Sequence, residues 1–374
     1  MDGSCRLASI HGIFFPMTTE LVTSSKRTGG LADPLLLAEW FAVGWSREVA
    51  VGSTLARRVI ARDVVLWRSG DGELHCWLDL CVHRGAKLSL GSVRNIGPSS
   101  AMTDRNEAAH TAGSCLVCPY HGWSYAESGQ CVAIPAHPGM MPPAKARAQI
   151  FQVRERYGVI WVCFGDSPAE LPVFPVAEKE GFRVLLAGPY RFRALGPRLI
   201  ENLLDVAHLG IVHAGLLGDP AQSEIEDYEV EMGALGPEAK QIRVWQPNPD
   251  GTGAGAHVAY HYEVLGPLTA GFVKLGGQEN SEKRFGILAQ VMPVDDEFSE
   301  MRLVMAMNYG QEIPDEELIA FQNRVTEQDR VIVESQRPEL LPLDLQAELH
   351  LRSDRMAIAY RKWLREIGFT YGVA

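Results

Sequence analysis

The sequence has 374 residues, of which 46% are hydrophobic and 22% are charged, a composition typical of a globular protein with more than one domain. The formal net charge of −11 at pH 7 disfavours a nucleic acid or an anionic membrane as partner, because either would require a basic surface. No uncharged apolar run approaches the roughly 18 residues that a membrane-spanning helix needs.

The first half of the chain is rich in strand patterns. Residues 1–35 are predicted to be an N-terminal extension, which lacks the basic start and long apolar core of a secretory signal. Residues 64–80, VVLWRSGDGELHCWLDL, alternate in polarity on both sides of a Gly-Asp-Gly turn, which predicts a β-hairpin. Residues 157–165, YGVIWVCFG, predict a buried strand, and the turn-rich residues after it indicate a domain boundary near 166–175.

The second half mixes helical and strand patterns. Helices are predicted over residues 197–215, 314–336 and 345–368, and strands over residues 257–265 and 300–309. The expected fold is therefore α+β. A small all-β domain, residues 36–170, precedes an α+β domain, residues 171–374, in which helices pack against a sheet.

Two short segments combine cysteine and histidine at close spacing. Cys81 and His83 lie in LCVHRGAKLSLG, and Cys118 and His121 lie in CLVCPYHGWSY. Zinc-finger half-sites usually pair cysteine with cysteine and histidine with histidine, whereas each half here is mixed. Mixed pairs suit a 2Fe–2S cluster in which two cysteines bind one iron and two histidines bind the other. A cluster is therefore favoured over zinc and over a chance coincidence.

The remaining cysteines need a separate interpretation. Cys115 offers an alternative ligand, because CLVC also contains a Cys-x-x-Cys spacing. For Cys115, and also for Cys76, Cys131 and Cys163, a small buried side chain is the expected role. Seven cysteines, an odd and sparse set, argue against a disulfide framework, so we expect a reducing, cytoplasmic setting.

The two segments resemble a known family. CVHRGAKLSLG with CPYHGWSY resembles the Rieske motif, and ERYGVIWVCFGD resembles the strand that closes the Rieske domains of ring-hydroxylating oxygenases. The resemblance implies that Cys81, His83, Cys118 and His121 bind the 2Fe–2S cluster, and it favours Cys118 over Cys115. The spacing between His83 and Cys118 is longer than is usual in the family. The surplus, about residues 92–114, is polar and is expected to form an inserted surface loop, which loop-closure entropy tolerates well.

A second group of metal-binding residue types lies in ENLLDVAHLGIVHAG, residues 201–215. On one helix, Asn202, Asp205 and His208 would share a face, and His213 would need a bulge or the helix end to join His208 on one metal. Two histidines with a carboxylate form the facial triad of non-haem Fe(II) oxygenases, which leaves positions open for dioxygen. The alternative is two unrelated histidines on an amphipathic helix.

This segment also resembles the mononuclear-iron motif of the Rieske oxygenases. The resemblance implies that His208 and His213 bind the iron. It also implies that Asp205 is a carboxylate that bridges to the cluster of a neighbouring subunit, and Asn202 is a further candidate catalytic residue.

The third iron ligand is expected from VTEQDRVIVESQ, residues 325–336. Asp329 stands where related oxygenases supply this carboxylate, which would complete the facial triad. Glu327 and Glu334 are alternatives, although charged residues on a helix more often form a solvated face.

The resemblance covers about residues 36–368 and implies the oxygenase component of a multicomponent Rieske oxygenase, with a helix-grip-like catalytic domain. Such an enzyme takes electrons from NAD(P)H through a flavin and iron–sulfur reductase, directly or through a ferredoxin, and activates O2 at Fe(II). The C-terminal residues resemble the homotrimeric demethylase and monooxygenase branch, so hydroxylation or demethylation of a small aromatic or heterocyclic substrate is expected. The alternatives are a ring cis-dihydroxylase, a Rieske electron carrier without oxygenase activity, and a zinc-binding interaction module.

The substrate pocket is expected between about residues 200 and 310. Candidate lining residues are Phe272, Phe285, Met292, Met305 and Asn308, although core packing is the commoner role of each residue taken singly. His257 and His261 lie at even spacing on a predicted strand and therefore on one face of it. For these two histidines, a core or surface role is favoured over a substrate contact.

Overall fold

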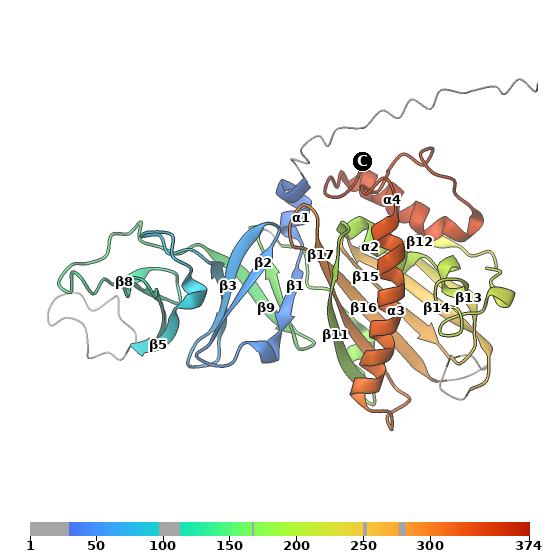
Figure 1. Ribbon diagram of the computed structural model, residues 1–374, viewed down its shortest axis with the longest axis horizontal. Helices are drawn as coiled ribbons and strands as arrows, with labels where there is room; N and C mark the ends of the chain where they lie inside the picture. The colour runs from blue at the N-terminus through green and yellow to red at the C-terminus, as the bar shows by residue number, and fades with distance from the viewer. Residues whose placement is uncertain (1–29, 97–112, 167, 250–252, 277–281) are drawn as a thin grey trace, which may run out of the picture.

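The computed structural model describes residues 30–96, 113–166, 168–249, 253–276 and 282–374, which form two lobes (Figure 1). The N-terminal lobe contains two antiparallel sheets. The six-stranded sheet has the order β1-β10-β9-β4-β3-β2, and the four-stranded sheet has the order β5-β6-β7-β8. The strands of this lobe are β1 (Phe41–Trp45), β2 (Thr54–Val59), β3 (Arg62–Arg68), β4 (Leu74–Leu78), β5 (Ser92–Ile96), β6 (Gly113–Val117), β7 (Ser124–Ala126), β8 (Cys131–Ala133), β9 (Ile150–Arg156) and β10 (Val159–Cys163).

Local patterns in this lobe form the expected elements. The predicted hairpin is confirmed as β3 and β4, which pair in register from Val64 opposite Leu78 to Arg68 opposite Leu74. The predicted buried strand is confirmed as β10, all of whose residues are buried between β1 and β9. Both predictions succeed because the alternation and the adjacent turn residues lie within one short segment.

The inserted segment is not a loop throughout, so the prediction for residues 92–114 is wrong at both ends. β5 and β6 pair along their length, with Val93 opposite Leu116 and Ile96 opposite Gly113. The Ser114 hydroxyl donates a 2.8 Å hydrogen bond to Asn95 Oδ1 across this pair. The alternation of these two short strands was not recognised in the sequence, because the residues around them are polar. Residues 97–112 of the predicted loop lie outside the described residues.

The C-terminal lobe is a seven-stranded antiparallel sheet with helices against it, so the predicted α+β class is confirmed (Figure 1). The strand order is β11-β17-β16-β15-β14-β13-β12. The strands are β11 (Arg183–Phe192), β12 (Val230–Met232), β13 (Pro237–Gln246), β14 (Ala256–Gly266), β15 (Thr269–Leu275), β16 (Arg284–Pro293) and β17 (Ser299–Met307).

Four α-helices and seven short 3-10 helices complete the described structure. The α-helices are α1 (Pro34–Ala38), α2 (Gly196–Leu204), α3 (Asp315–Ser335) and α4 (Arg355–Ile367). The 3-10 helices are η1 (Gly30–Ala32), η2 (Ser46–Glu48), η3 (Leu88–Leu90), η4 (Pro175–Glu178), η5 (Ala207–Gly210), η6 (Pro220–Gln222) and η7 (Arg352–Asp354). In the described parts of the chain, no helix is long and apolar enough to cross a membrane.

Two of the predicted helices are shorter than expected. The stretch 197–215 is not one helix: α2 ends at Leu204, and Asp205 has an extended backbone with φ −80° and ψ 128°. The stretch 345–368 is helical only in α4 and in the short turn η7 before it. Leu349 and Leu351, which lie in the predicted helix, are 97% and 70% exposed, so their side chains do not support a helix by packing there.

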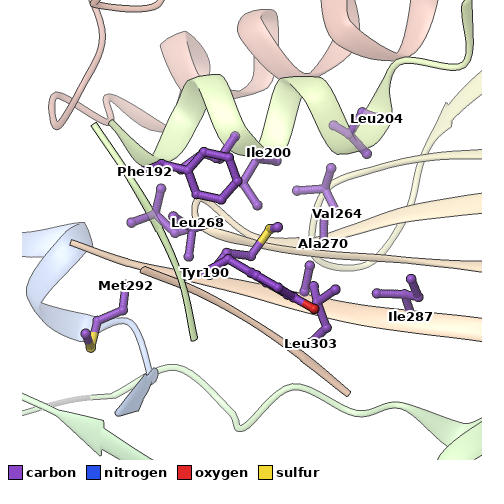
Figure 2. Packing of buried hydrophobic residues seen from close by; sticks show 14 of the residues in the cluster. Tyr190, Phe192, Ile200, Leu204, Val264, Leu268, Ala270, Ile287, Met292 and Leu303 are labelled. Carbon is purple, nitrogen blue, oxygen red and sulfur yellow. The ribbon is translucent and has the colours of Figure 1, made fainter. Parts of the chain in front are cut away.

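The core of the C-terminal lobe lies between α2 and the sheet. Ile200 and Leu204 point from α2 toward the strands, where Leu268 and Ala270 meet them (Figure 2). α4 joins the same core, since the buried Tyr360 hydroxyl donates a 2.6 Å hydrogen bond to the Pro267 carbonyl. This packing holds the end of α2, and therefore the turn that follows it, above the sheet.

The two lobes are joined by polar contacts as well as by apolar packing. The Ala42 amide of β1 donates to Gln290 Oε1 of β16 at 2.9 Å, and Arg302 Nη1 donates to the Ala42 carbonyl at 2.9 Å. Near the start of the described chain, the Asp33 carboxylate accepts a 2.8 Å bond from the Thr370 hydroxyl. Strand β1 thus belongs to the six-stranded sheet and is also hydrogen-bonded to side chains of the seven-stranded sheet.

Candidate metal centres

Two loops of the same design carry the cysteine–histidine pairs. The Gly85 amide donates to the Cys81 carbonyl at 2.9 Å, and the Gly122 amide donates to the Cys118 carbonyl at 3.1 Å. Both glycines have φ of +72°, a left-handed conformation that other residues rarely adopt. The sequence therefore folds each pair into a tight turn beyond a strand end, with cysteine and histidine on one loop.

The side chains of the two loops meet with the thiols inside and the imidazoles outside. Cys81 and Cys118 are each 2% exposed, whereas His83 is half-buried and His121 is exposed. The two imidazole centroids lie 4.7 Å apart, and the His83 ring stacks on Trp123 at 4.5 Å. His83 Nδ1 is buried with no hydrogen-bond partner among the described residues. Two soft thiols and two imidazoles around one centre fit a mixed-ligand 2Fe–2S cluster.

Tyr125 contacts this centre, and the remaining described cysteines are buried. The Tyr125 hydroxyl lies 3.0 Å from Cys81 Sγ, and burial raises the pKa of the Tyr125 hydroxyl above its ordinary range. Cys115 lies within β6, the strand that leads directly into the loop that holds Cys118 and His121. As predicted, Cys76, Cys115, Cys131 and Cys163 are free and buried. Tyr125 was missed by the sequence analysis, because tyrosine near a cysteine carries no recognisable spacing.

The second group converges from two elements far apart in sequence. His208 lies on η5, His213 lies in the turn after it, and Asp329 lies on α3. Asp329 Oδ1 is 3.5 Å from His208 Nε2 and 3.0 Å from His213 Nε2. One donor atom from each residue lies within 4.8 Å of the others, so the three side chains could hold one metal ion. Two imidazoles and a carboxylate are the donor set of a non-haem Fe(II) site.

The end of α2 positions the two histidines. Asp205 Oδ1 accepts a 2.7 Å bond from the Ala207 amide, a local turn that competes with continuation of the helix. The expectation that Asn202, Asp205 and His208 share a helix face is therefore wrong for the last two residues. The helix end instead brings His208 and His213 together, with ring centroids 5.1 Å apart.

Each histidine has a polar partner behind it. His213 Nδ1 donates to Gln328 Oε1 at 2.9 Å, which leaves Nε2 directed toward Asp329. Burial acts to lower the pKa of His213, but the Asp329 carboxylate outweighs it and holds this pKa above its ordinary value. His208 Nδ1 lies 3.8 Å from Asp205 Oδ2. Gln328 was missed by the sequence analysis, since its partner is distant in sequence.

The alternative carboxylates lie away from the histidines. Glu327 is 62% exposed and pairs with Arg330 at 3.1 Å. Glu334 accepts a 2.8 Å bond from the Arg193 amide. Of the three carboxylates considered on α3, Asp329 alone is brought to the histidines in the described structure.

A cavity of about 730 Å³ lies between the helices and the sheet, and His208, His213 and Asp329 form part of its wall. Of the predicted lining residues, Phe272, Phe285 and Met305 contribute to it. The candidates Met292 and Asn308 do not line it, and for Met292 the favoured core role agrees with the structure. Met292 packs in the core away from the other labelled residues of Figure 2, and Asn308 bonds to the backbone of Glu282 and Arg284.

His257 and His261 do not face this cavity. They alternate along β14 with Tyr260 and Tyr262, which line the cavity, so the histidines point to the opposite face of the sheet. The favoured interpretation, a role without substrate contact, agrees with this placement.

A second hollow, of about 510 Å³, lies on the other side of His208. Asp205 lines this hollow but not the larger cavity, whereas Asn202 and His208 line both. His208 thus lies between the surface hollow that Asp205 lines and the cavity that contains the three candidate metal-binding side chains.

Two family models match the chain, one in each lobe. The Rieske [2Fe-2S] domain matches residues 39–152, and the vanillate O-demethylase oxygenase C-terminal domain matches residues 192–368. The first match contains both cysteine–histidine loops. The second contains His208, His213 and Asp329.

Characterised relatives match over most of the chain. Methylxanthine N1-demethylase NdmA of Pseudomonas putida is 30% identical over 321 residues, which are 84% of this chain and 82% of NdmA. The probable methylxanthine N7-demethylase NdmC of Pseudomonas sp. (strain TJI-51) is 33% identical over 58% of this chain and 77% of its own length. The solved structure of the Pseudomonas putida CBB5 NdmA QL mutant with caffeine has a TM-score of 0.72 at 28% identity, covering 89% of this chain and 91% of that chain. Because the likeness to NdmA continues through both lobes, the chain belongs to the Rieske non-haem iron oxygenases, as an oxygenase component with a 2Fe–2S cluster and a mononuclear iron.

Proposed function

We propose that this oxygenase removes an N- or O-bound methyl group from a small aromatic or heterocyclic substrate. The observation that carries the proposal is the cavity, whose wall combines aromatic and aliphatic strand residues with the two histidines and Asp329. In this proposal the cluster ligands are Cys81, His83, Cys118 and His121, and the iron ligands are His208, His213 and Asp329. The division between the two domains lies at about residues 166–175.

Side chains of this protein bind the substrate and orient the ring of His213. Apolar strand residues bind the ring system, and Gln328 fixes the ring of His213 so that Nε2 faces the metal. When bound, the iron supplies activation of dioxygen with electrons delivered through the cluster. The net reaction uses O2, two electrons and two protons to convert the methyl group to hydroxymethyl plus water. The hydroxymethyl product then breaks down to the demethylated compound and formaldehyde.

The proposal includes a homotrimer in which electrons pass between subunits, and the arrangement of the two centres supports a contact between copies. The sheet that carries the Cys118 loop lies at the end of its lobe farthest from the seven-stranded sheet (Figure 1). Exposed apolar residues lie beside the cluster loops, namely Leu80, Val82, Leu90 and Tyr120. Others, Ile332 and Leu349, line the hollow of Asp205. Two apolar surfaces of this kind suit a contact between the cluster of one copy and the hollow of another.

Electron supply completes the proposal. The enzyme draws electrons from NAD(P)H through a flavin and iron–sulfur reductase, with or without an intervening ferredoxin. One relative, the oxidoreductase NdmD of Pseudomonas putida, matches 35% of this chain and 20% of its own length. A cytoplasmic location is consistent with six free cysteines in the described residues.

Metal analysis and product analysis test the proposal. The purified protein should be red-brown and contain about three irons per chain, two in the cluster and one mononuclear. With a reductase and NADH, it should release formaldehyde from members of a panel of N-methylated heterocycles and O-methylated aromatics. A colourless zinc protein would contradict the cluster, and a cis-diol product without formaldehyde would favour ring dihydroxylation instead.

Tyr125→Phe is expected to lower the reduction potential of the cluster. The hydroxyl lies 3.0 Å from Cys81 Sγ, and hydrogen bonds to ligand sulfurs stabilise the more negative, reduced cluster. Loss of one such bond should shift the potential by about 20 to 60 mV, since about 59 mV corresponds to a tenfold change for one electron. Redox titration followed by electron paramagnetic resonance measures the shift. An unchanged potential with an intact cluster would show that the hydroxyl does not act on Cys81.

Replacement of residues 97–112 by a two-residue Asn-Gly turn is expected to leave the cluster spectrum unchanged. Ile96 and Gly113 are directly opposite in the β5–β6 pair, and a two-residue turn suits such a junction. The deletion must not include residues 94–96, because these belong to β5 and their pairing supports the strand before Cys118. Visible absorption and iron content are the measurements. Loss of the cluster would show that the removed segment is needed to hold it.

A further inference from the structure

The N-terminal lobe contains a group of metal-binding residue types in addition to the cluster ligands. Glu73, His75 and Glu127 each offer one donor atom, and the three donor atoms lie within 4.8 Å of one another. The triad of two histidines and Asp329 in the other lobe meets the same condition. The group in the N-terminal lobe combines one imidazole with two carboxylates, a donor set that transition metals bind and that a purely acidic surface cluster lacks.

The β3–β4 hairpin holds the imidazole of this group in place. His75 of β4 lies directly opposite Trp67 of β3, and its ring stacks on the indole with a centroid distance of 4.2 Å. The Nε2 atom of His75 is buried and has no hydrogen-bond partner among the described residues. An ordinary imidazole is mostly neutral at pH 7 and above, so a ring nitrogen of His75 has a lone pair available for a metal.

The two glutamates reach the imidazole from different elements. Glu73 lies in the turn before β4, where its carbonyl accepts a 2.9 Å bond from the Ser69 amide. Glu127 follows β7, and its Oε1 accepts a 3.2 Å bond from the Ser114 amide of β6. Neither glutamate forms an ion pair with a lysine or arginine within the described parts of the chain. Two carboxylates so close repel each other, and a bound cation would offset this repulsion.

We propose that Glu73, His75 and Glu127 bind one divalent transition-metal ion, for which Zn²⁺ is the best match. Zinc accepts both imidazole and carboxylate ligands, whereas Mg²⁺ and Ca²⁺ prefer oxygen ligands alone. Tetrahedral zinc with bonds of about 2.0 Å needs donor atoms about 3.3 Å apart, and rotation of the glutamate side chains can bring the three donors to that spacing. A water molecule provides the fourth ligand.

The ion joins the two sheets that support the cluster loops. The β3–β4 hairpin of the six-stranded sheet provides Glu73 and His75 and leads to the first cluster loop. The turn after β7 of the four-stranded sheet provides Glu127, and the second cluster loop precedes β7. The Gly70 amide of the hairpin turn already donates a 2.6 Å bond to the Ser114 hydroxyl of β6. A metal beside this single bond should therefore stabilise the lobe and its cluster.

Equilibrium dialysis of the full-length, iron-loaded protein against zinc chloride tests the site. Zinc and iron are measured in the same sample, and the wild-type protein should bind about one zinc per chain while it keeps about three irons. Zinc gained only as iron is lost would place the zinc in the iron site and overturn the proposal. Calcium chloride in the same procedure should give no stoichiometric binding. Binding of calcium as strong as that of zinc would contradict a site that uses the imidazole.

A glutamine variant and a matched control locate the zinc. Glu127→Gln retains the side-chain size and the oxygen that accepts from the Ser114 amide, and it should weaken zinc binding by at least about 10-fold. Asp71→Asn removes the same charge from the neighbouring turn, but Asp71 Oδ1 is already bonded to the Ser69 hydroxyl and the Glu73 amide. The control should stay within about threefold of the wild-type affinity. Equal weakening in both variants would show that net charge alone attracts zinc.

A second variant tests the imidazole. His75→Phe keeps an aromatic ring against Trp67, removes the nitrogen donor and should also weaken zinc binding by at least about 10-fold. Unchanged binding in this variant, with a normal melting temperature, would mean an adventitious ion on the two glutamates only and would overturn the site.

Thermal loss of the cluster tests the structural role of the ion. With zinc at about ten times its dissociation constant, the temperature at which the visible absorption of the wild-type cluster disappears should rise by about 3 to 8 °C. Glu127→Gln at the same zinc concentration should show no rise. Zinc binding to the wild-type protein without this rise would refute the link between the two sheets. None of these measurements depends on turnover, so they test the zinc site separately from the demethylase function.

Discussion

Asp205→Asn is expected to keep both iron centres and to slow electron transfer from the cluster by more than about 100-fold. Partners of metal-binding histidines typically contribute about 10- to 100-fold, and a group that also bridges two subunits should exceed that range. Asn can still accept the 2.7 Å bond from the Ala207 amide through its Oδ1, so the turn after α2 is preserved. The change removes the negative charge that faces His208 Nδ1 at 3.8 Å.

The measurement is rapid reduction of the cluster, followed by its reoxidation in the presence of substrate and dioxygen. Asp219→Asn is the matched control, because Asp219 caps the Ala221 amide at 2.8 Å in the same way and lies outside the metal sites. Normal reoxidation in Asp205→Asn, with iron retained, would exclude the bridge. Loss of iron as the main effect would show that Asp205 mainly supports the iron site.

Asp329→Ala is expected to lose the mononuclear iron and to reduce turnover by more than about 100-fold. Removal of a metal ligand should have a larger effect than the about 10- to 100-fold typical of a residue that only contacts a ligand. Asp329 Oδ1 lies 3.0 Å from His213 Nε2, and without it two imidazoles remain for the metal. The iron content should fall from about three to about two per chain, with the visible spectrum of the cluster unchanged.

Glu327→Ala provides the matched control for this ligand. Glu327 lies on the same helix two residues earlier, is exposed and pairs with Arg330, so its loss should leave iron content and turnover near the wild-type values. Iron loss in Glu327→Ala, with iron retained in Asp329→Ala, would move the third ligand to the earlier carboxylate. Loss of the cluster together with the iron would contradict the independence of the two sites.

Features with local causes could be predicted from the sequence. Each cysteine–histidine pair spans a few residues around a glycine that adopts φ of +72°, so the loop geometry depends on little outside the segment. The β3–β4 hairpin and α3 likewise follow from alternation, turn residues and periodicity within one stretch. The family resemblance extended this information to the chemistry of both metal sites.

Features that join distant segments were decided by the tertiary structure. The end of α2 at Leu204 depends on the turn of Asp205 and on packing against the sheet, and periodicity alone had predicted a continuous helix. The contacts of His213 with Gln328 and Asp329 cross more than a hundred residues of sequence. Phe272 faces the cavity because its strand pairs in one register between β14 and β16, and a shift of one residue would turn it to the opposite side. The residue types were visible in the sequence, but which of them meet depends on strand register and helix packing, which are set by the whole chain.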